Sequence, residues 1–520
     1  MNAISVLFGG NLSGEAFEPL LNGKNSVSLS VEQARKFPGV QKTVLLASNG
    51  DFSFLNGVEI EQTSAPWTKR SLLEKIAKLE EGFDCVYFAF ADCPFLDPAL
   101  AGAIADRHLR YAAEYSYADG WPYGIAPETL SPGTAAILAN ISGEDGHVER
   151  DILFSVIQKD INAFDIETEI SAVDLRCHRL NLCADSKRNM LLLNNFIAAE
   201  GRNLPAAADI ERIIAEQPQI LRTLPAFYPI QVSGGCPQKC ALCPYPLFTD
   251  STGCKDFMDT GRFKELLEKI ITFSGDAVID LSLWGELSLH PEKMKLIEAV
   301  LSYRELALII ETSGIGWKTQ ELEECAELSR KAHPGKNLPP PLSWIVSLDT
   351  SDPKRYAELR GSGYGEAEAC AKKLLSLFAK NCYVQAVRIA GTEDDTEKFY
   401  RYWKEAAPSG EKNIIIQKFD DFCGVMERKQ ASDISPVIRQ SCWHIMRDMP
   451  VLIDGNVPLC REELKLLGNQ HGENSRSLGN VFTDSLENIW QNGTPYYVEH
   501  CKKNYTEICA NCDEYYTYNF

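Results

Sequence analysis

Apolar, strand-like runs alternate regularly with helical stretches between residues 228 and 418 of this 520-residue chain. The predicted strands are Tyr228–Ser233, Ala277–Leu283, Leu306–Glu311, Leu342–Leu348, Cys382–Ile389 and Asn413–Lys418. The predicted helices between them are Gly261–Phe273, Glu292–Tyr303, Thr319–Ala332, Gly365–Ala379 and Thr396–Ala406. A βα repeat of this kind forms a parallel barrel or part of one. Because a closed barrel has eight such units, the sequence predicts an open, partial (β/α)6 TIM-like barrel over residues 225–425.

The first 200 residues show a second alternation of strands and helices. Apolar runs occur at Ile4–Phe8, Lys42–Ala47 and Cys85–Ala91, and a helical stretch covers Ser71–Glu81. Apolar strands flanked by helices are typical of a mainly parallel α/β sheet. We therefore predict an α/β domain over residues 1–200, a helical connector over 201–224, and a separate module over 430–520.

Composition and charge exclude several classes of protein. Hydrophobic residues make up 45% and charged residues 24% of the chain, which is ordinary globular composition. No apolar run reaches the roughly 18 residues of a membrane span, and the first ten residues lack the basic region of a signal peptide. The net charge of −20 disfavours nucleic acid and anionic lipid as partners. We expect a cytoplasmic protein with no nucleic-acid or membrane partner.

Seventeen cysteines without an export signal indicate metal or redox chemistry rather than disulfides. Three lie within eight residues, in the segment Cys236-Pro-Gln-Lys-Cys240-Ala-Leu-Cys243. Five lie in the last eighty residues: Cys442, Cys460, Cys501, Cys509 and Cys512. The other nine have no spacing typical of ligands and are interpreted as small buried hydrophobes: Cys85, Cys93, Cys177, Cys183, Cys254, Cys325, Cys370, Cys382 and Cys423.

The three-cysteine loop directly follows the first predicted barrel strand, where active sites of such barrels lie. Three thiolates suit three irons of a 4Fe–4S cluster and leave the fourth iron open to a ligand. A structural zinc ion normally has a fourth protein ligand. The nearest histidine, His290, belongs to the next βα loop.

This CxxxCxxC loop and several later motifs resemble the radical S-adenosylmethionine (SAM) superfamily. The resemblance implies that Cys236, Cys240 and Cys243 hold a 4Fe–4S cluster. It also implies SAM contacts from residues at the ends of later strands: Gly285, Glu286, Thr312, Ser313, Ser347, Asp349, Gln385 and Arg388. The alternative for these polar residues is ordinary turn, cap and barrel-interior roles. One departure is Ala241, where the superfamily usually has an aromatic residue.

The resemblance also implies an activity and its partners. Radical SAM enzymes cleave SAM reductively to a 5′-deoxyadenosyl radical, which abstracts a hydrogen atom from the substrate. A flavodoxin or ferredoxin is then the expected electron donor. The sequence itself identifies no catalytic acid or base.

The C-terminal cysteines resemble the SPASM/Twitch extension of that superfamily. The matching pieces are Cys442, the Asp454-Gly455 turn before Cys460, the segment Leu478–Trp490, and the closing Cys509-Ala-Asn-Cys512. Cys442, Cys460, Cys509 and Cys512 make a complete ligand set for one auxiliary 4Fe–4S cluster, and Cys501 is interpreted mainly as packing. A structural zinc site with the same four cysteine ligands is the alternative. A fully ligated cluster favours a role in taking up an electron, hence a net oxidation.

The N-terminal region resembles nucleotidyltransferases more loosely. The resemblance places Gly9 and Gly10 in a phosphate loop and Asp92 as a magnesium ligand. Glu18 stands where a lysine is expected, and a carboxylate there repels a triphosphate. We expect a nucleotidyltransferase-like fold that binds rather than transfers. The three-part arrangement resembles spirochaete-type SPASM proteins.

The sequence thus predicts a radical SAM oxidoreductase or maturase that acts on a peptide or protein, or on a sugar or nucleotide-linked metabolite. Two alternatives stay open. One is a bifunctional enzyme whose N-terminal nucleotidyltransferase is active. The other is a zinc-stabilised binding protein without chemistry.

Overall fold

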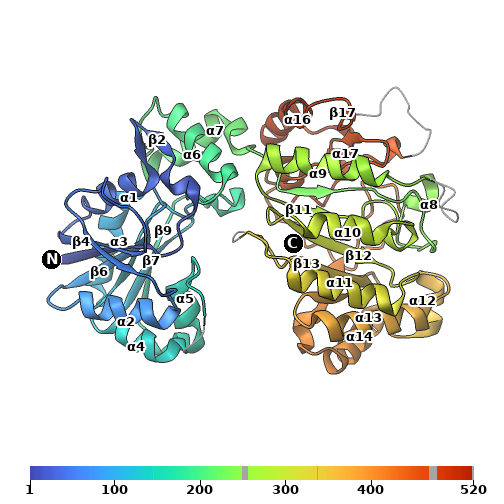
Figure 1. Ribbon diagram of the computed structural model, residues 1–520, viewed down its shortest axis with the longest axis horizontal. Coiled ribbons are helices and arrows are strands. Elements are labelled where there is room, and N and C mark those ends of the chain that lie inside the picture. Colours follow the sequence, from blue (N-terminus) through green and yellow to red (C-terminus); the bar gives the residue numbers. More distant parts are fainter. Residues whose placement is uncertain (144–145, 249–255, 336–337, 468–476, 518–520) are drawn as a thin grey trace. The chain divides into compact units, whose positions relative to one another are not determined.

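The computed structural model describes residues 1–143, 146–248, 256–335, 338–467 and 477–517. It contains two compact units, Met1–Thr223 and Leu224–Phe520 (Figure 1). One of the nine cysteines interpreted as packing residues, Cys254, lies outside the described residues. The boundary at Thr223 falls within the predicted connector, and the finer division of the second unit near residues 425–430 stays a prediction.

The first unit is built on a seven-stranded sheet with the order β5-β4-β1-β6-β8-β7-β9. Its strands are β1 (Ala3–Gly9), β4 (Val40–Ser48), β5 (Glu59–Thr63), β6 (Cys85–Phe90), β7 (Tyr115–Asp119), β8 (Glu128–Leu130) and β9 (Ile166–Ile170). All pairs are parallel except those of β8 with β6 and β7. Strands β1 and β6 are buried along their whole length. This confirms the predicted mainly parallel α/β sheet.

Helices and one hairpin complete the first unit. The helices are α1 (Ser26–Ala34), α2 (Lys69–Leu79), α3 (Pro98–Arg110), α4 (Thr134–Ser142), α5 (Ile152–Ile157), α6 (Lys187–Ala199) and α7 (Ile210–Glu216). The hairpin pairs β2 (Pro19–Leu21) with β3 (Lys24–Asn25). Helix α2 begins at a reciprocal cap between Thr68 and Ser71 and buries Leu72, Leu73 and Ile76, as its apolar spacing predicts.

The second unit contains six parallel strands that pair in chain order. They are β10 (Phe227–Pro229), β11 (Ala277–Asp280), β12 (Leu306–Thr312), β13 (Leu342–Ser347), β14 (Cys382–Arg388) and β15 (Ile414–Lys418). Strands β10 and β15 are the two edges, so the sheet is an open barrel. The predicted partial (β/α)6 barrel is confirmed.

Helices that alternate with these strands lie side by side on one face of the sheet (Figure 1). They are α9 (Thr260–Ser274), α10 (Lys293–Leu301), α11 (Thr319–Lys331), α13 (Tyr364–Phe378) and α14 (Glu393–Ala406). Two short helices were not predicted, α8 (Tyr245–Phe248) and α12 (Pro353–Leu359). Helix α12 follows from a local signal, because Asp352 caps its first amides and Pro353 suits its first turn.

The C-terminal segment, which begins near residue 430, packs against both edges of the open barrel. Along β10, the amides of Met449 and Val451 donate to the carbonyls of Phe227 and Pro229, at 2.9 and 2.8 Å. At the other edge, Lys418 on β15 lies 3.1 Å from the Asp513 carboxylate and also contacts Glu514. The segment therefore bridges the gap that six strands leave in a barrel.

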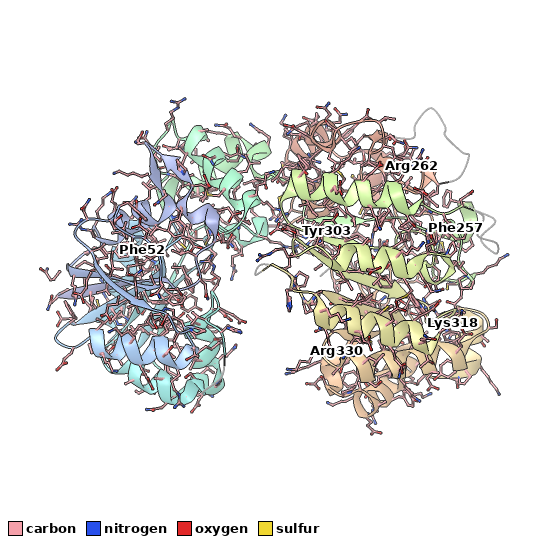
Figure 2. The ribbon with its side chains drawn as sticks, viewed as in Figure 1. Phe52, Phe257, Arg262, Tyr303, Lys318 and Arg330 are labelled. Carbon is pink, nitrogen blue, oxygen red and sulfur yellow. The ribbon has the colours of Figure 1, made fainter. Side chains whose placement is uncertain are left out.

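Short elements form this C-terminal segment: α15 (Trp443–Arg447), β16 (Asn456–Pro458), β17 (Ser477–Asn480), α16 (Leu486–Cys501) and α17 (Glu507–Asn511). It also contacts the outer helices. The guanidinium of Arg262 on α9 lies 5.0 Å from the centre of the Phe482 ring (Figure 2), and Lys269 donates to the Val481 carbonyl at 2.6 Å. None of the described helices is long and apolar enough to cross a membrane.

Candidate functional site

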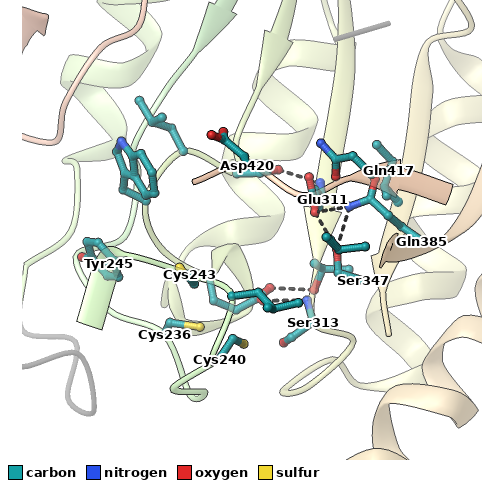
Figure 3. A pocket seen from close by; sticks show the side chains of 18 of the residues that line it. Cys236, Cys240, Cys243, Tyr245, Glu311, Ser313, Ser347, Gln385, Gln417 and Asp420 are labelled. Carbon is teal, nitrogen blue, oxygen red and sulfur yellow. Dashed lines mark hydrogen bonds between the residues drawn. The ribbon is translucent and has the colours of Figure 1, made fainter. Parts of the chain in front are cut away.

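A cavity of about 560 Å³ opens at the carboxyl ends of the six barrel strands (Figure 3). Residues from every strand or the loop after it line the cavity, as expected where parallel strands end together. Its wall combines the three-cysteine loop with polar side chains from β12, β13 and β14. Most of the predicted SAM contacts and the three-cysteine loop are thus brought together from segments about 150 residues apart.

The three-cysteine loop follows β10 and is held by helix α12. The amide of Ala241 donates to the Leu359 carbonyl at 2.8 Å, and Gln238 donates to the Tyr356 hydroxyl at 2.8 Å. Figure 3 shows the side chains of Cys236, Cys240 and Cys243 on one loop at the cavity wall. Ala241 lacks the aromatic side chain that is usual in the superfamily, but its backbone amide anchors the loop.

All three thiols are partly buried next to carboxylates. Burial and, to a smaller extent, the Glu286 carboxylate raise the pKa of Cys236 to about 12. Burial likewise raises the pKa of Cys243 to about 11 and raises that of Cys240. A raised pKa favours the thiol form of these groups, so a metal centre held by them would release protons on binding.

Gly285 is required by a close approach of two backbones. A Cβ atom at this position would lie 2.0 Å from the Ser233 carbonyl oxygen. The close approach lets the Glu286 amide donate to the Gly235 carbonyl at 2.9 Å. The loop after β11 is therefore fastened to the start of the cysteine loop, and the Glu286 side chain is directed toward the end of β12.

The Glu286 carboxylate is buried and accepts two hydrogen bonds. The Thr312 hydroxyl donates to one oxygen at 2.6 Å and the Ser313 amide to the other at 2.8 Å. The Thr312 hydroxyl itself accepts from the Trp317 indole at 3.0 Å and from the Gly314 amide at 3.1 Å. Its own proton must therefore point to Glu286. Burial raises the pKa of Glu286, whereas these donors lower it.

Ser347 and Gln385 meet at a carboxylate that the sequence did not single out. Glu311 on β12 accepts from the Ser347 hydroxyl at 2.5 Å and from the Gln385 amide at 2.9 Å (Figure 3). Glu311 was treated as the end of a strand, and no motif marked it. The one available signal for Glu311 was its position: it is a polar residue at the end of the strand that precedes the strand of Ser347.

Asp349 contacts Arg360, a second cavity residue that the sequence did not single out. Its backbone is left-handed at φ 64°, and its carboxylate accepts from the Val387 amide at 2.9 Å and lies 3.2 Å from the Arg360 guanidinium. Arg360 and Asp349 both line the cavity. Arg388, by contrast, is exposed and is not among the residues that line the cavity, so the structure does not bring it to this site.

One cavity carboxyl has the proton affinity of an acid or base near neutral pH. Burial raises the pKa of Asp280, at the end of β11, to about 7. Asp280 was counted as an interior strand residue in the sequence. Its pKa depends on packing, which no local pattern encodes.

The second set of cysteines surrounds a smaller cavity in the C-terminal segment. Cys442, Cys460, Cys509 and Cys512 all line it, together with His444 and His500. The amide of Cys442 donates to His500 at 3.3 Å, and the Glu514 amide donates to the Cys512 sulfur at 3.3 Å. Arg461 lines both this cavity and the main one, so the two sites share a wall.

Two further cysteines, Cys501 and Cys423, differ in their relation to the second cysteine set. Cys501 contacts Tyr497 and Ser441 and does not line either cavity. Cys423 was interpreted as a packing residue, but its thiol donates a hydrogen bond to the Cys512 sulfur, which raises the pKa of Cys423 and lowers that of Cys512. Cys423 and Phe422 both have left-handed backbones, with φ of 59° and 52°. This correction could not come from spacing, because Cys423 lies 89 residues before its partner.

The donor chemistry of both cysteine sets fits an iron–sulfur cluster, because soft thiolates suit iron–sulfur centres. Four cysteines also suit a structural zinc ion, which is the alternative for the second set.

Comparison with known proteins agrees with this assignment. Residues 442–513 match the SPASM family, an iron–sulfur cluster-binding domain. This domain lies directly behind an open βα barrel that carries the three-cysteine loop. This order of motifs is the one that the sequence analysis predicts for a radical SAM enzyme with a SPASM domain. The match supports an iron–sulfur cluster at the second cysteine set.

Relatives are found among spirochaete proteins. An uncharacterised protein of Treponema pallidum (strain Nichols) is 32% identical over 376 residues, which cover 71% of this chain and 98% of that protein. This chain belongs to the same family as that protein. A second Treponema protein is 38% identical over 72 residues, or 32% of its own length.

Two solved structures resemble parts of this chain at low identity. SuiB of Streptococcus suis, bound to the precursor peptide SuiA, is similar over 68% of this chain and 80% of its own, with 15% identity and a TM-score of 0.40. A cytidylyltransferase of Leptospira borgpetersenii is similar over 42% of this chain and 95% of its own, with 16% identity and a TM-score of 0.36.

Proposed function

We propose that this protein is a radical SAM oxidoreductase or maturase that abstracts a hydrogen atom from its substrate. The observation that carries the proposal is the shared wall of its two sites. The three-cysteine loop lines the main cavity, the second cysteine set lines the smaller cavity, and Arg461 lines both. Proximity of an auxiliary cluster to the substrate cavity suits a net oxidation, in which that cluster takes up the electron.

Each residue set has a role in this proposal. Cys236, Cys240 and Cys243 hold the catalytic 4Fe–4S cluster, and Cys442, Cys460, Cys509 and Cys512 hold the auxiliary one. When bound, the first cluster and SAM supply a 5′-deoxyadenosyl radical. Glu286 offers a buried carboxylate to the amino group of SAM and is kept an acceptor by its two donors.

The remaining polar residues of the cavity bind and orient the bound nucleoside and amino acid. Ser347 and Gln385, held by Glu311, face the cavity from adjacent strands. Thr312, Ser313, Gly285 and Asp349 complete the proposed SAM contacts, whereas the exposed Arg388 is omitted from them. The apolar side chains of Ile309, Ile345 and Ile415 on the floor of the cavity exclude water.

Asp280 is the proposed proton acceptor. It lines the cavity, and a pKa of about 7 lets the carboxyl group accept a proton and release it again near neutral pH. Oxidation of a carbon that bears a hydroxyl or amino group needs such an acceptor, because the heteroatom proton leaves together with an electron. The substrate class is a peptide or protein, or a sugar or nucleotide-linked metabolite.

The test uses reconstituted protein under anaerobic conditions with SAM and dithionite. The proposal predicts 5′-deoxyadenosine from the wild type and none from the Cys236→Ala variant. A Cys325→Ala variant is the matched control, because Cys325 is a buried residue of helix α11 and does not line the cavity. Equal product from all three proteins would refute the proposal.

The substrate class is then tested with two fractions of a cell extract, one of peptides and one of small metabolites. The proposal predicts that one fraction accelerates 5′-deoxyadenosine formation and gains a product two mass units lighter. A product of unchanged mass would rule out the net oxidation while leaving the radical chemistry intact.

A further inference from the structure

Two carboxylates of the first unit converge on one arginine. Asp92 follows β6, Asp185 precedes α6, and Arg150 precedes α5. The two terminal nitrogens of Arg150 lie 2.6 Å from the two oxygens of Asp92, and one of them also lies 2.9 Å from an oxygen of Asp185. The geometry is a bidentate fork with a third contact, the arrangement a guanidinium makes with carboxylates at its strongest.

Arg150 and Asn189 together supply a donor to all four carboxylate oxygens of the pair. The second oxygen of Asp185 accepts from the Asn189 amide at 2.7 Å. Asp92 and Asp185 retain only 4% and 10% exposure of their side chains. Hard divalent cations such as Mg²⁺ and Mn²⁺ need these same carboxylate oxygens as ligands. A guanidinium and a divalent cation therefore compete for one place.

Aromatic rings also pack near the Arg150 guanidinium. It lies 4.9 Å from the centre of the Phe90 ring and 5.8 Å from that of Tyr123. An arginine carries its charge at every physiological pH, so it neutralises one of the two carboxylates permanently. Removing one member of such a buried pair leaves an uncompensated charge, which favours uptake of another cation.

We propose that Arg150 is the resident cation of the Asp92–Asp185 pair, so that the N-terminal unit keeps this site without a divalent metal and serves as a binding module. The proposal replaces the expectation that Asp92 is a magnesium ligand. It also disfavours the bifunctional alternative, because a metal-dependent transferase must hold a divalent cation. The inference concerns the first unit only and does not rest on the function proposed above.

The test measures Mn²⁺ binding by electron paramagnetic resonance on the full-length protein with its clusters oxidised. The proposal predicts that the wild type and the Asp185→Asn variant bind the same number of ions. The Arg150→Met variant is expected to bind one more, and the Arg150→Met/Asp185→Asn double variant is expected to lose it. Arg176→Met is the matched control, because Arg176 makes an exposed fork with Asp119 and Asp174, and it should gain no ion of comparable affinity.

Two results overturn the proposal. The first is a Mn²⁺ ion in the wild type that the Asp185→Asn variant loses, since the pair would then hold a metal beside Arg150. The second is an Arg150→Met variant that unfolds at the wild-type temperature yet gains no ion. If Arg150→Met does not fold, Arg150→Lys keeps one charge and is expected to gain no ion, and the comparison of wild type with Asp185→Asn still decides the matter.

Discussion

Replacing Glu286 with glutamine tests whether this carboxylate must accept the two hydrogen bonds that it receives in the main cavity. Thr312 already accepts two hydrogen bonds, and Ser313 can only donate its amide, so both groups must donate to residue 286. A glutamine has one acceptor oxygen and presents its NH2 group to the second donor. One donor stays unsatisfied, at a cost of about 1–3 kcal/mol.

The larger effect is expected on SAM binding. A hydrogen bond to a charged group contributes about 1.5–3 kcal/mol, and about 1.4 kcal/mol corresponds to a tenfold change in affinity. The Glu286→Gln variant should therefore bind SAM about 10- to 150-fold more weakly, as measured by equilibrium binding to the anaerobic, iron-loaded protein. Its iron content should not change.

The matched control is Glu292→Gln, which makes the same change at an exposed carboxylate at the start of α10. This control should bind SAM like the wild type. An unchanged affinity in Glu286→Gln, with full iron content, would refute the assignment of Glu286 to the amino group of SAM.

Three further predictions concern packing, pH and metal. Gly285→Ala should lower the free energy of unfolding of the second unit by about 1–3 kcal/mol, because its Cβ would lie 2.0 Å from the Ser233 oxygen; Gly365→Ala, which has open space, should not. Burial lowers the pKa of His108 to about 4, and between about pH 6.5 and 4 the unfolded imidazole binds a proton that the native one does not. In denaturant titrations the wild-type first unit should therefore lose stability relative to a His108→Gln variant as pH falls through this window. Removing iron with a chelator should increase hydrogen exchange in residues 442–513 and leave residues 1–223 unchanged.

The regular parts of the fold were predictable because their signals are local. Each barrel strand was placed within a few residues by a short apolar run, and each long helix by apolar spacing. The three-cysteine loop and the Gly285-Glu286 turn were equally visible, since each motif lies within ten residues. These elements position the cavity.

The remaining parts depend on contacts between distant segments. Glu311 gains its role only when Ser347 and Gln385 lie beside it on adjacent strands. Arg150 reaches Asp92 across 58 residues, and the backbone at Met449 and Val451 joins β10 across more than 200 residues. No periodicity or spacing in one sequence encodes such pairs, because tertiary packing creates them.

The central claim is that the two cysteine sets hold two 4Fe–4S clusters, one of which cleaves SAM. The most direct test measures iron, sulfide and zinc in the anaerobic protein and assays 5′-deoxyadenosine under dithionite, for the wild type and a Cys236→Ala/Cys240→Ala/Cys243→Ala variant. We predict about eight irons in the wild type, and about four with loss of 5′-deoxyadenosine in the variant. Zinc with little iron, and no 5′-deoxyadenosine from the wild type, would contradict the claim.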